Sequence, residues 1–82
     1  MVEEIYQQWI VTGRYRSGDI GYLGERRGHG GPGLVPFSGN AYRYATELKA
    51  QAAGYEYQSF FLDGEFSLDR LSDTRNPRDI NF

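Results

Sequence analysis

The absence of cysteine constrains the fold of this chain more than any other feature of its sequence. A chain of 82 residues has room for one core only. Small domains with too little apolar core are usually held together by disulfides or thiolate-bound metals, and neither can form here. The core must therefore come from packing alone. Its main resource is a set of thirteen aromatic side chains, made up of seven Tyr, five Phe and one Trp.

The charge of the chain is small overall but unevenly distributed. The formal net charge is −2, which argues against general binding to nucleic acid. Residues 14–49 contain six basic and three acidic side chains, whereas residues 50–82 contain three basic and six acidic ones. Such asymmetry indicates charged partners without naming them.

Two features of the sequence predict a cytoplasmic protein. Cysteine is absent, and Glu3 and Glu4 stand where a secretory signal would be basic. No apolar stretch approaches the roughly 20 residues that a membrane-spanning helix needs. We therefore expect no secretion and no membrane partner.

The N-terminal part of the chain is expected to form a β-hairpin. Residues 5–15 alternate in character, and the β-branched and aromatic run at residues 9–12 favours a strand. A helix remains the alternative, because residues 2, 5, 6 and 9 are apolar at helical spacing. Residues 16–19 are typical of a turn and residues 20–23 of a short returning strand.

Residues 24–33 are expected to form a loop, since five of these ten residues are glycine. The part from Gly28 to Gly33 matches the spacing of a phosphate-binding loop, which must lead directly into a helix. Here residues 34–37 intervene, and Pro32 removes a backbone donor. A loop that contacts a partner is therefore the preferred interpretation, with a phosphate cradle as the alternative.

A helix is predicted over residues 40–53. Ser38 or Asn40 would cap its N-terminus, and Gly54 would end it in a left-handed conformation. The predicted inward stripe consists of Ala41, Ala45, Leu48 and Ala52.

The strongest local signal is the pair Asp63-Gly64, which is typical of a two-residue hairpin turn with positive φ. It predicts paired strands over residues 55–62 and 65–71, with Phe61 opposite Phe66. The predicted fold class is α+β, a small antiparallel sheet in ββαββ order with one helix packed on one face. We expect one domain over residues 1–72 and an irregular tail over residues 73–82.

No residue pattern indicates catalysis, a cofactor or a metal. His29 is the only histidine, and a general base needs an orienting partner that the sequence does not designate. No cysteine, second histidine or calcium-loop spacing is present. The expectation is a protein that is not an enzyme and takes no cofactor.

Two surfaces are predicted to bind a protein partner. One is the glycine-rich loop with Arg26, Arg27 and His29. The other is the outer face of the second hairpin, where an apolar centre is ringed by acids, as in many interfaces; its members are Phe60, Leu62, Glu65 and Asp69. If this face is exposed, a homodimer would cover it, and the alternative is burial within the monomer.

A nucleic-acid-binding accessory protein is the second hypothesis. The first hairpin combines arginines with tyrosines, a composition that single-strand binders use. Its members are Arg14, Tyr15, Arg16, Tyr22, Arg26 and Arg27.

Residues 9–18 (WIVTGRYRSG), 41–48 (AYRYATEL) and 54–57 (GYEY) resemble small phage- or prophage-encoded proteins. Some proteins of that kind are anti-CRISPR or other anti-defence inhibitors that act by binding. The resemblance implies a stoichiometric binder rather than an enzyme, with an inhibitor of a host defence complex as one such binder. It transfers no functional residue.

Overall fold

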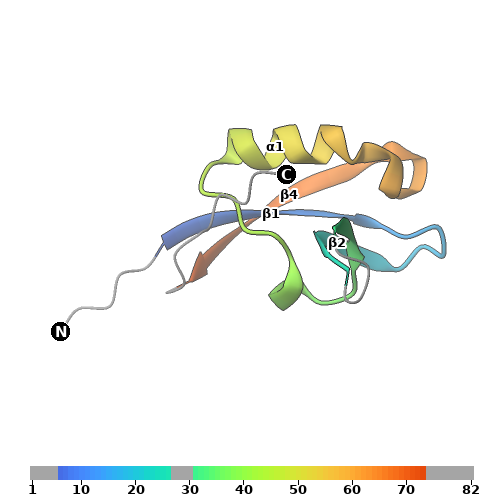
Figure 1. Ribbon diagram of the computed structural model, residues 1–82, viewed down its shortest axis with the longest axis horizontal. Helices are drawn as coiled ribbons and strands as arrows, with labels where there is room; N and C mark the ends of the chain where they lie inside the picture. Colours follow the sequence, from blue (N-terminus) through green and yellow to red (C-terminus); the bar gives the residue numbers. More distant parts are fainter. Residues whose placement is uncertain (1–5, 27–30, 74–82) are drawn as a thin grey trace.

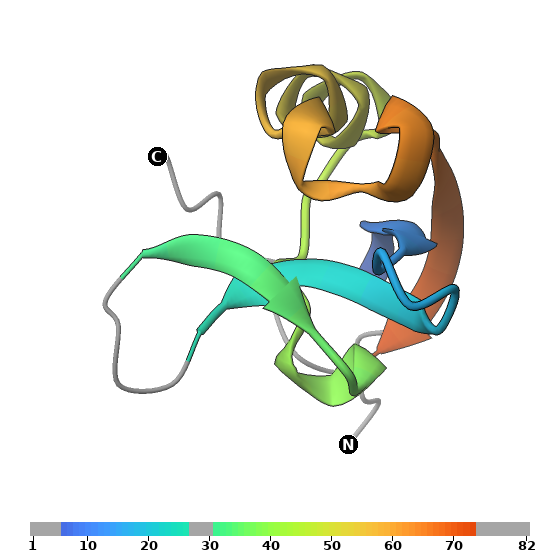
Figure 2. The same ribbon diagram turned by 90° about the vertical axis from the view of Figure 1, so that its right-hand side faces the viewer.

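The computed structural model describes residues 6–26 and 31–73. Four strands form one antiparallel sheet with the order β3-β2-β1-β4, and α1 packs on one of its faces (Figures 1 and 2). The strands and the helix are β1 (Tyr6–Arg14), β2 (Ile20–Glu25), β3 (Pro32–Val35), α1 (Glu47–Glu56) and β4 (Phe66–Asp73). Three short 3-10 turns connect them, namely η1 (Ser38–Asn40), η2 (Gln58–Phe60) and η3 (Leu62–Gly64).

The predicted α+β class, with an antiparallel sheet and one helix on one face, is confirmed. The predicted ββαββ order is wrong, because the chain runs βββαβ. The third strand begins with two residues assigned to the glycine-rich loop, Pro32 and Gly33, and continues through Leu34 and Val35. One strand of the predicted second hairpin does not form. No helix in the described ranges is long and apolar enough to cross a membrane.

The first hairpin is confirmed. β1 and β2 pair from Thr12 with Tyr22 to Arg14 with Ile20, around a turn in which Gly18 has a φ of 93°. β2 continues to Glu25 and pairs with β3, so the connection between these strands is shorter than the predicted loop. The centre of that loop, residues 27–30, lies outside the described residues.

Residues 41–44 are extended, not helical as predicted. β1 and β2 separate beyond their short pairing, and this segment runs between them. Tyr44 exchanges two backbone hydrogen bonds of 2.9 Å with Trp9, and the Tyr42 amide donates to the Leu23 carbonyl at 2.9 Å. These sheet contacts satisfy backbone groups that a helix would otherwise have paired internally.

The helix begins seven residues later than predicted. Thr46 is its N-cap, and its Oγ1 accepts a hydrogen bond from the Lys49 amide at 3.2 Å. The buried face of the helix also differs from the predicted stripe. Ala50 and Ala53 are buried, while Leu48 is 76% exposed. Gly54 lies inside the helix instead of ending it.

The Asp63-Gly64 turn forms, but it does not join two strands. Asp63 and Gly64 have φ values of 56° and 69°, and the Glu65 amide donates to the Leu62 carbonyl at 3.2 Å. Residues 55–62 belong to the end of α1, to η2 and to η3, so the predicted strand there is wrong. β4 pairs instead with β1 over eight positions. The predicted proximity of Phe61 to Phe66 survives, with ring centroids 6.1 Å apart.

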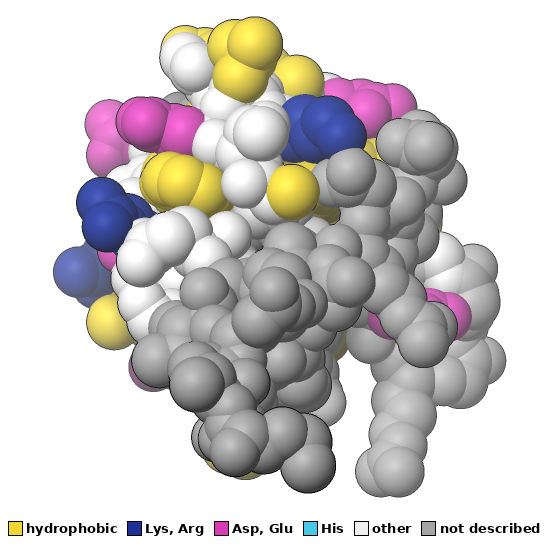
Figure 3. All heavy atoms as spheres, turned by 90° about the vertical axis from the view of Figure 1, so that its left-hand side faces the viewer, with side chains coloured by type: hydrophobic (Ala, Val, Ile, Leu, Met, Phe, Trp, Pro, Cys, Tyr) yellow, Lys and Arg dark blue, Asp and Glu magenta, His cyan; other side chains and the backbone are white. Residues whose placement is uncertain are grey.

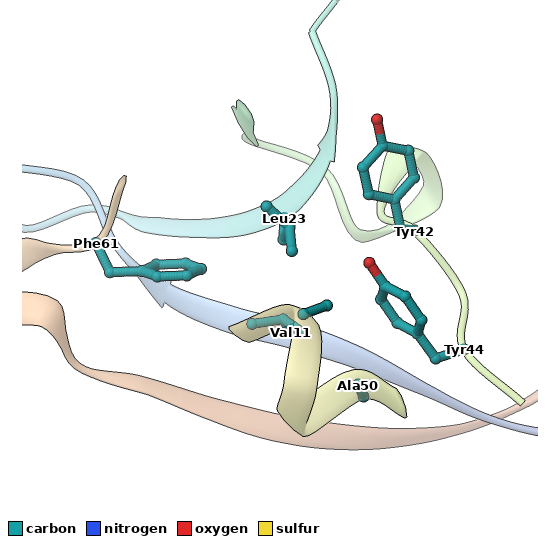
Figure 4. Packing of buried hydrophobic residues seen from close by; sticks show 7 residues of the cluster. Val11, Leu23, Tyr42, Tyr44, Ala50 and Phe61 are labelled. Atoms are coloured by element: carbon teal, nitrogen blue, oxygen red, sulfur yellow. The ribbon is translucent and has the colours of Figure 1, made fainter. Parts of the chain in front are cut away.

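The main core lies between the sheet and α1 (Figure 4). Its buried members are Val11, Leu23, Tyr42, Tyr44, Ala50, Ala53 and Phe61. The opposite face of the sheet is also covered near its centre, where Ile10 and Val35 are buried. η1 lies on that side of the sheet, away from α1 (Figure 2).

Candidate functional site

An open groove runs between α1 and the edge strand β4 and has a volume of about 610 Å³. α1 contributes residues spaced four apart along one face of the helix, and β4 and its preceding turn form the other wall. The lining residues are Glu47, Gln51, Tyr55, Gln58, Gly64, Glu65, Phe66, Ser67 and Leu68.

Aromatic side chains form the floor at one end of the groove. The Tyr55 ring meets the Phe66 ring edge to face, with centroids 5.1 Å apart, and Tyr55 is 59% exposed. Phe66 in turn packs against the buried Phe61. This arrangement leaves aromatic surface open to solvent beside β4 while anchoring it to the core.

Two glycines make this aromatic packing fit. A Cβ on Gly54 would overlap the Phe66 ring, and a Cβ on Gly13 would overlap the Phe61 ring. The rings therefore lie directly against the backbone of α1 and β1. Side chains at these two positions would push the floor of the groove outward.

The outer edge of β4 has no partner strand within the described part of the chain. Trp9 uses its backbone N–H and C=O for Tyr44, on the side of β1 that faces away from β4. Trp9 lies opposite Arg70, and this pair is not hydrogen-bonded, because both backbone groups of Trp9 are used by Tyr44. Hydrogen-bonded and non-hydrogen-bonded pairs alternate along an antiparallel ladder. The backbone groups of Phe66, Leu68 and Arg70 therefore point outward from the sheet, beside the groove.

The face of β4 away from α1 is acidic. Glu65 is extended and continues the alternation of β4, so it shares this face with Ser67 and Asp69, while Glu65 and Ser67 also border the groove along the β4 edge. The Thr12 hydroxyl donates to the Asp69 carboxylate at 2.6 Å, which confirms that Asp69 lies on the same face as Thr12. Both Glu65 and Asp69 are exposed.

The predicted second interface is not assembled as expected, because residues 55–62 are not a strand. Phe60 lies in η2, stacked on Tyr57 with centroids 5.5 Å apart, and is 40% exposed. Leu62 lies in η3, in a separate pocket next to Arg14. Of the four predicted residues, only Glu65 and Asp69 lie together on one face of the sheet. Their role in binding stays a prediction.

The predicted loop surface is only partly described. Arg26 is exposed, its amide donates to the Gly31 carbonyl at 3.2 Å, and its side chain lies over Gly33. Arg27 and His29 lie outside the described residues.

The tyrosines of the first hairpin do not form one stacking platform. Tyr15 packs over Gly21, whereas Tyr22 lies on the opposite face of the hairpin from Gly21 by strand alternation. The Arg14 guanidinium donates to the Gly18 carbonyl at 2.9 Å. This geometry gives little support to the nucleic-acid hypothesis, since single-strand binders present aromatic rings on a shared surface.

The titratable groups of the core are held in their neutral forms. Burial raises the pKa values of Tyr42, Tyr44 and Tyr57 above the ordinary phenol value, so these phenols stay neutral to a higher pH than exposed tyrosines. Within residues 6–26 and 31–73, no cluster of three His, Cys, Asp or Glu residues has a metal-binding arrangement.

Comparisons of this chain with protein-family models, with curated proteins and with solved structures find no match. The groove and the free edge of β4 beside it are therefore the features from which a function can be inferred.

Sequence reasoning missed Gln51, Tyr55 and Leu68 as site residues. The sequence signal that would have predicted the helical wall of the groove is Thr46, which is the N-cap of α1. From that start, positions 47, 51 and 55 lie on one face of the helix. A helix over residues 40–53 does not include Tyr55, so the predicted helix could not align Tyr55 with positions 47 and 51.

Proposed function

We propose that this chain is a non-catalytic protein-binding module that holds an extended segment of its partner in the α1–β4 groove. The observation that carries the proposal is the coincidence of an open groove with outward backbone groups of β4 at the same place. Strand addition uses such edges, because main-chain hydrogen bonds supply affinity and neighbouring pockets supply specificity.

The exposed apolar surface supports this function. Tyr55 is 59% exposed at the floor of the groove. Leu48 lies on α1 outside the groove and is 76% exposed. Apolar side chains also reach the surface at the helical end of the molecule, at the top of Figure 3. Rigid aromatic side chains such as Tyr55 supply much of the binding energy at protein interfaces. The partner class implied by the resemblance to phage-encoded inhibitors stays a prediction.

The test is a selection of random peptides from a displayed library on the parent protein. Gln51→Arg places a long charged side chain in the groove and should remove most of the binding of the selected peptides. Ala52→Arg is the matched control, because Ala52 is exposed on the same helix but does not line the groove. Equal binding by the parent and Gln51→Arg, or a selection that yields no peptide, would refute the proposal.

Single-stranded oligonucleotides discriminate the nucleic-acid hypothesis. A protein-binding module should show no oligonucleotide binding at low salt, measured by fluorescence anisotropy. Binding that weakens steeply as salt rises would favour the other hypothesis.

A further inference from the structure

The two faces of a strand added to β4 would meet different chemical surroundings. Side chains of a paired strand alternate between the faces of the sheet, whichever direction the added strand runs. One set would therefore enter the groove between β4 and α1. The other set would lie beside the outer face of β4, opposite α1.

The groove side offers apolar surface next to the edge of β4. Phe66 and Leu68 of β4 and Tyr55 of α1 supply this apolar surface, and polar side chains complete the lining, namely Glu47, Gln51 and Gln58. Beyond Leu68, Arg70 lies on this same face, where its guanidinium donates to the Gln7 side chain. The helical wall of the groove carries the Glu47 carboxylate, so the groove side holds charges of both signs, whereas the opposite side of β4 carries two carboxylates.

The opposite side is suited to basic side chains. Glu65, Ser67 and Asp69 line it at successive alternate positions, about 7 Å apart along the strand. A residue paired with Ser67 would lie diagonally next to both carboxylates, within reach of a Lys or Arg side chain. Opposite charges in such positions stabilise strand pairing, and like charges weaken it.

We propose that the segment held in the groove alternates apolar side chains with Lys or Arg. This inference rests on the proposed function and adds the chemistry of the partner. The apolar side chains would enter between β4 and α1, and the basic side chains would lie over Glu65 and Asp69. Backbone hydrogen bonds to Leu68 and Arg70 would hold the segment in place.

A second copy of this chain suits the edge less well. Two β4 strands related by a two-fold axis would join in antiparallel orientation, with equivalent faces on the same side. The acidic face of one copy would then continue into the acidic face of the other. In the register centred on Asp69, the two Asp69 carboxylates would lie directly opposite each other, which is unfavourable.

The test uses fluorescein-labelled eight-residue peptides and fluorescence anisotropy. A peptide that alternates valine with lysine should bind, and its affinity should fall as salt rises. A peptide that alternates valine with glutamate should bind roughly tenfold more weakly. A peptide with the four valines and four lysines in separate blocks should also bind more weakly, and N-methylation of alternate amides facing β4 should abolish binding.

Variants of the protein locate the charge recognition. The double variant Glu65→Gln with Asp69→Asn should remove most of the preference for lysine over glutamate. It should leave the affinity for an alternating valine–threonine peptide unchanged. The matched control, Asp19→Asn with Glu25→Gln, removes the same charge from the turn before β2 and from the last residue of β2, which is not the edge strand beside the groove. The preference should persist in that control.

Amide hydrogen exchange distinguishes the outcomes. Binding should protect the Leu68 and Arg70 amides, while the Ser67 and Asp69 amides are already paired with β1. If all alternating peptides bind equally and protect Leu68 and Arg70, the groove binds strands and the inferred partner chemistry is wrong. If no peptide binds, the proposed function fails as well. A protein that instead doubles its mass with concentration, with Leu68 protected, would make a second copy the occupant and overturn the inference.

Discussion

At the scale of single residues, the architecture depends on places where a side chain is absent. Phe66 lies against the backbone of α1 at Gly54, and Phe61 lies against the backbone of β1 at Gly13. Glycine normally weakens a helix interior, by about 1 kcal/mol relative to alanine. Gly54 is buried and helical, so close packing of Phe66 is the reason for a glycine at this position.

Gly54→Ala should therefore destabilise the protein even though alanine favours helices. We expect a loss of about 1–3 kcal/mol in the free energy of unfolding, because the new methyl group overlaps the Phe66 ring. Urea denaturation measures the change. Ala52→Gly, at an exposed position of the same helix, is the control and should cost about 1 kcal/mol through propensity alone. An increase in stability of Gly54→Ala would contradict the packing argument.

A second residue-scale effect concerns the Tyr44 phenol, which is buried and has no hydrogen-bond partner among the described residues. Burial raises the pKa of Tyr44, because the phenolate would lose its hydration. The stabilising effect of keeping Tyr44 neutral is fully present below the unfolded-state pKa of about 10. It is lost as the pH rises from there towards the folded-state pKa.

The free energy of unfolding should therefore fall above about pH 10, by up to about 1.4 kcal/mol per pH unit for each such phenol. Tyr44→Phe should make this fall shallower, and at neutral pH it should leave stability unchanged or raise it by about 1 kcal/mol. Urea denaturation at pH 7 and pH 10.5 tests both statements. The exposed Tyr55→Phe is the control and should keep the parental slope. A Tyr44→Phe variant with the parental slope would assign the titration to other groups.

At the scale of elements, the start of α1 is decided by competition between the helix and the sheet. Tyr42 and Tyr44 give their backbone groups to β2 and β1, so the chain stays extended up to Thr46. Thr46 then accepts the hydrogen bond from Lys49 that begins the helix. The local sequence favours Ser38 and Asn40 as helix caps, but in the structure they are the first and last residues of the 3-10 turn η1.

Thr46→Ala should cost about 1 kcal/mol of stability, as the loss of an N-cap usually does. Thr46→Ser should retain most of that stability, because serine also caps helices. Ser38→Ala is the control for the cap expected from sequence and should change stability by less than about 0.5 kcal/mol. Thermal or urea unfolding of the three variants is sufficient. If Ser38→Ala lost more stability than Thr46→Ala, the helix would begin near residue 40, as the sequence pattern predicted, and not at Glu47.

At the scale of the whole molecule, β1 organises the fold. It pairs with β2 and with β4, and Trp9 also pairs with Tyr44. Its side chains are buried on both faces of the sheet, with Val11 against the α1 layer and Ile10 on the opposite side. A small domain with no disulfide uses one strand in two packing layers to bury enough apolar surface.

Ile10→Ala should therefore destabilise strongly although Ile10 faces away from α1. We expect a cost of about 2–5 kcal/mol, as for other buried isoleucines. Ile20→Ala is the matched control, because the same side chain is 55% exposed there, and it should cost less than about 1 kcal/mol. Chemical denaturation measures both. Similar costs for the two variants would mean that the face opposite α1 is not a packed layer.

Local patterns in the sequence determined the features that depend on neighbouring residues. Alternation and β-branched residues predicted β1, and Gly18 stands in the predicted turn with positive φ. The Asp63-Gly64 pair predicted a turn with positive φ at both positions, which the structure contains. These features follow from backbone sterics over a few residues, so no tertiary contact is needed to specify them.

The tertiary structure alone decided the partners of each element. A turn signal does not say what it joins, and the turn after Phe61 leads from a 3-10 turn into a strand that pairs with the distant β1. The groove arises from this long-range pairing, because it sets β4 beside α1 with one edge free. Glu65 and Asp69 were predicted to share the outer face of a hairpin formed by residues 55–62 and 65–71, and that hairpin does not form. They still share a face, because side chains alternate along any strand and this alternation is a local property of β4. The other wall of the groove is formed by α1, and its place beside β4 is set by tertiary packing.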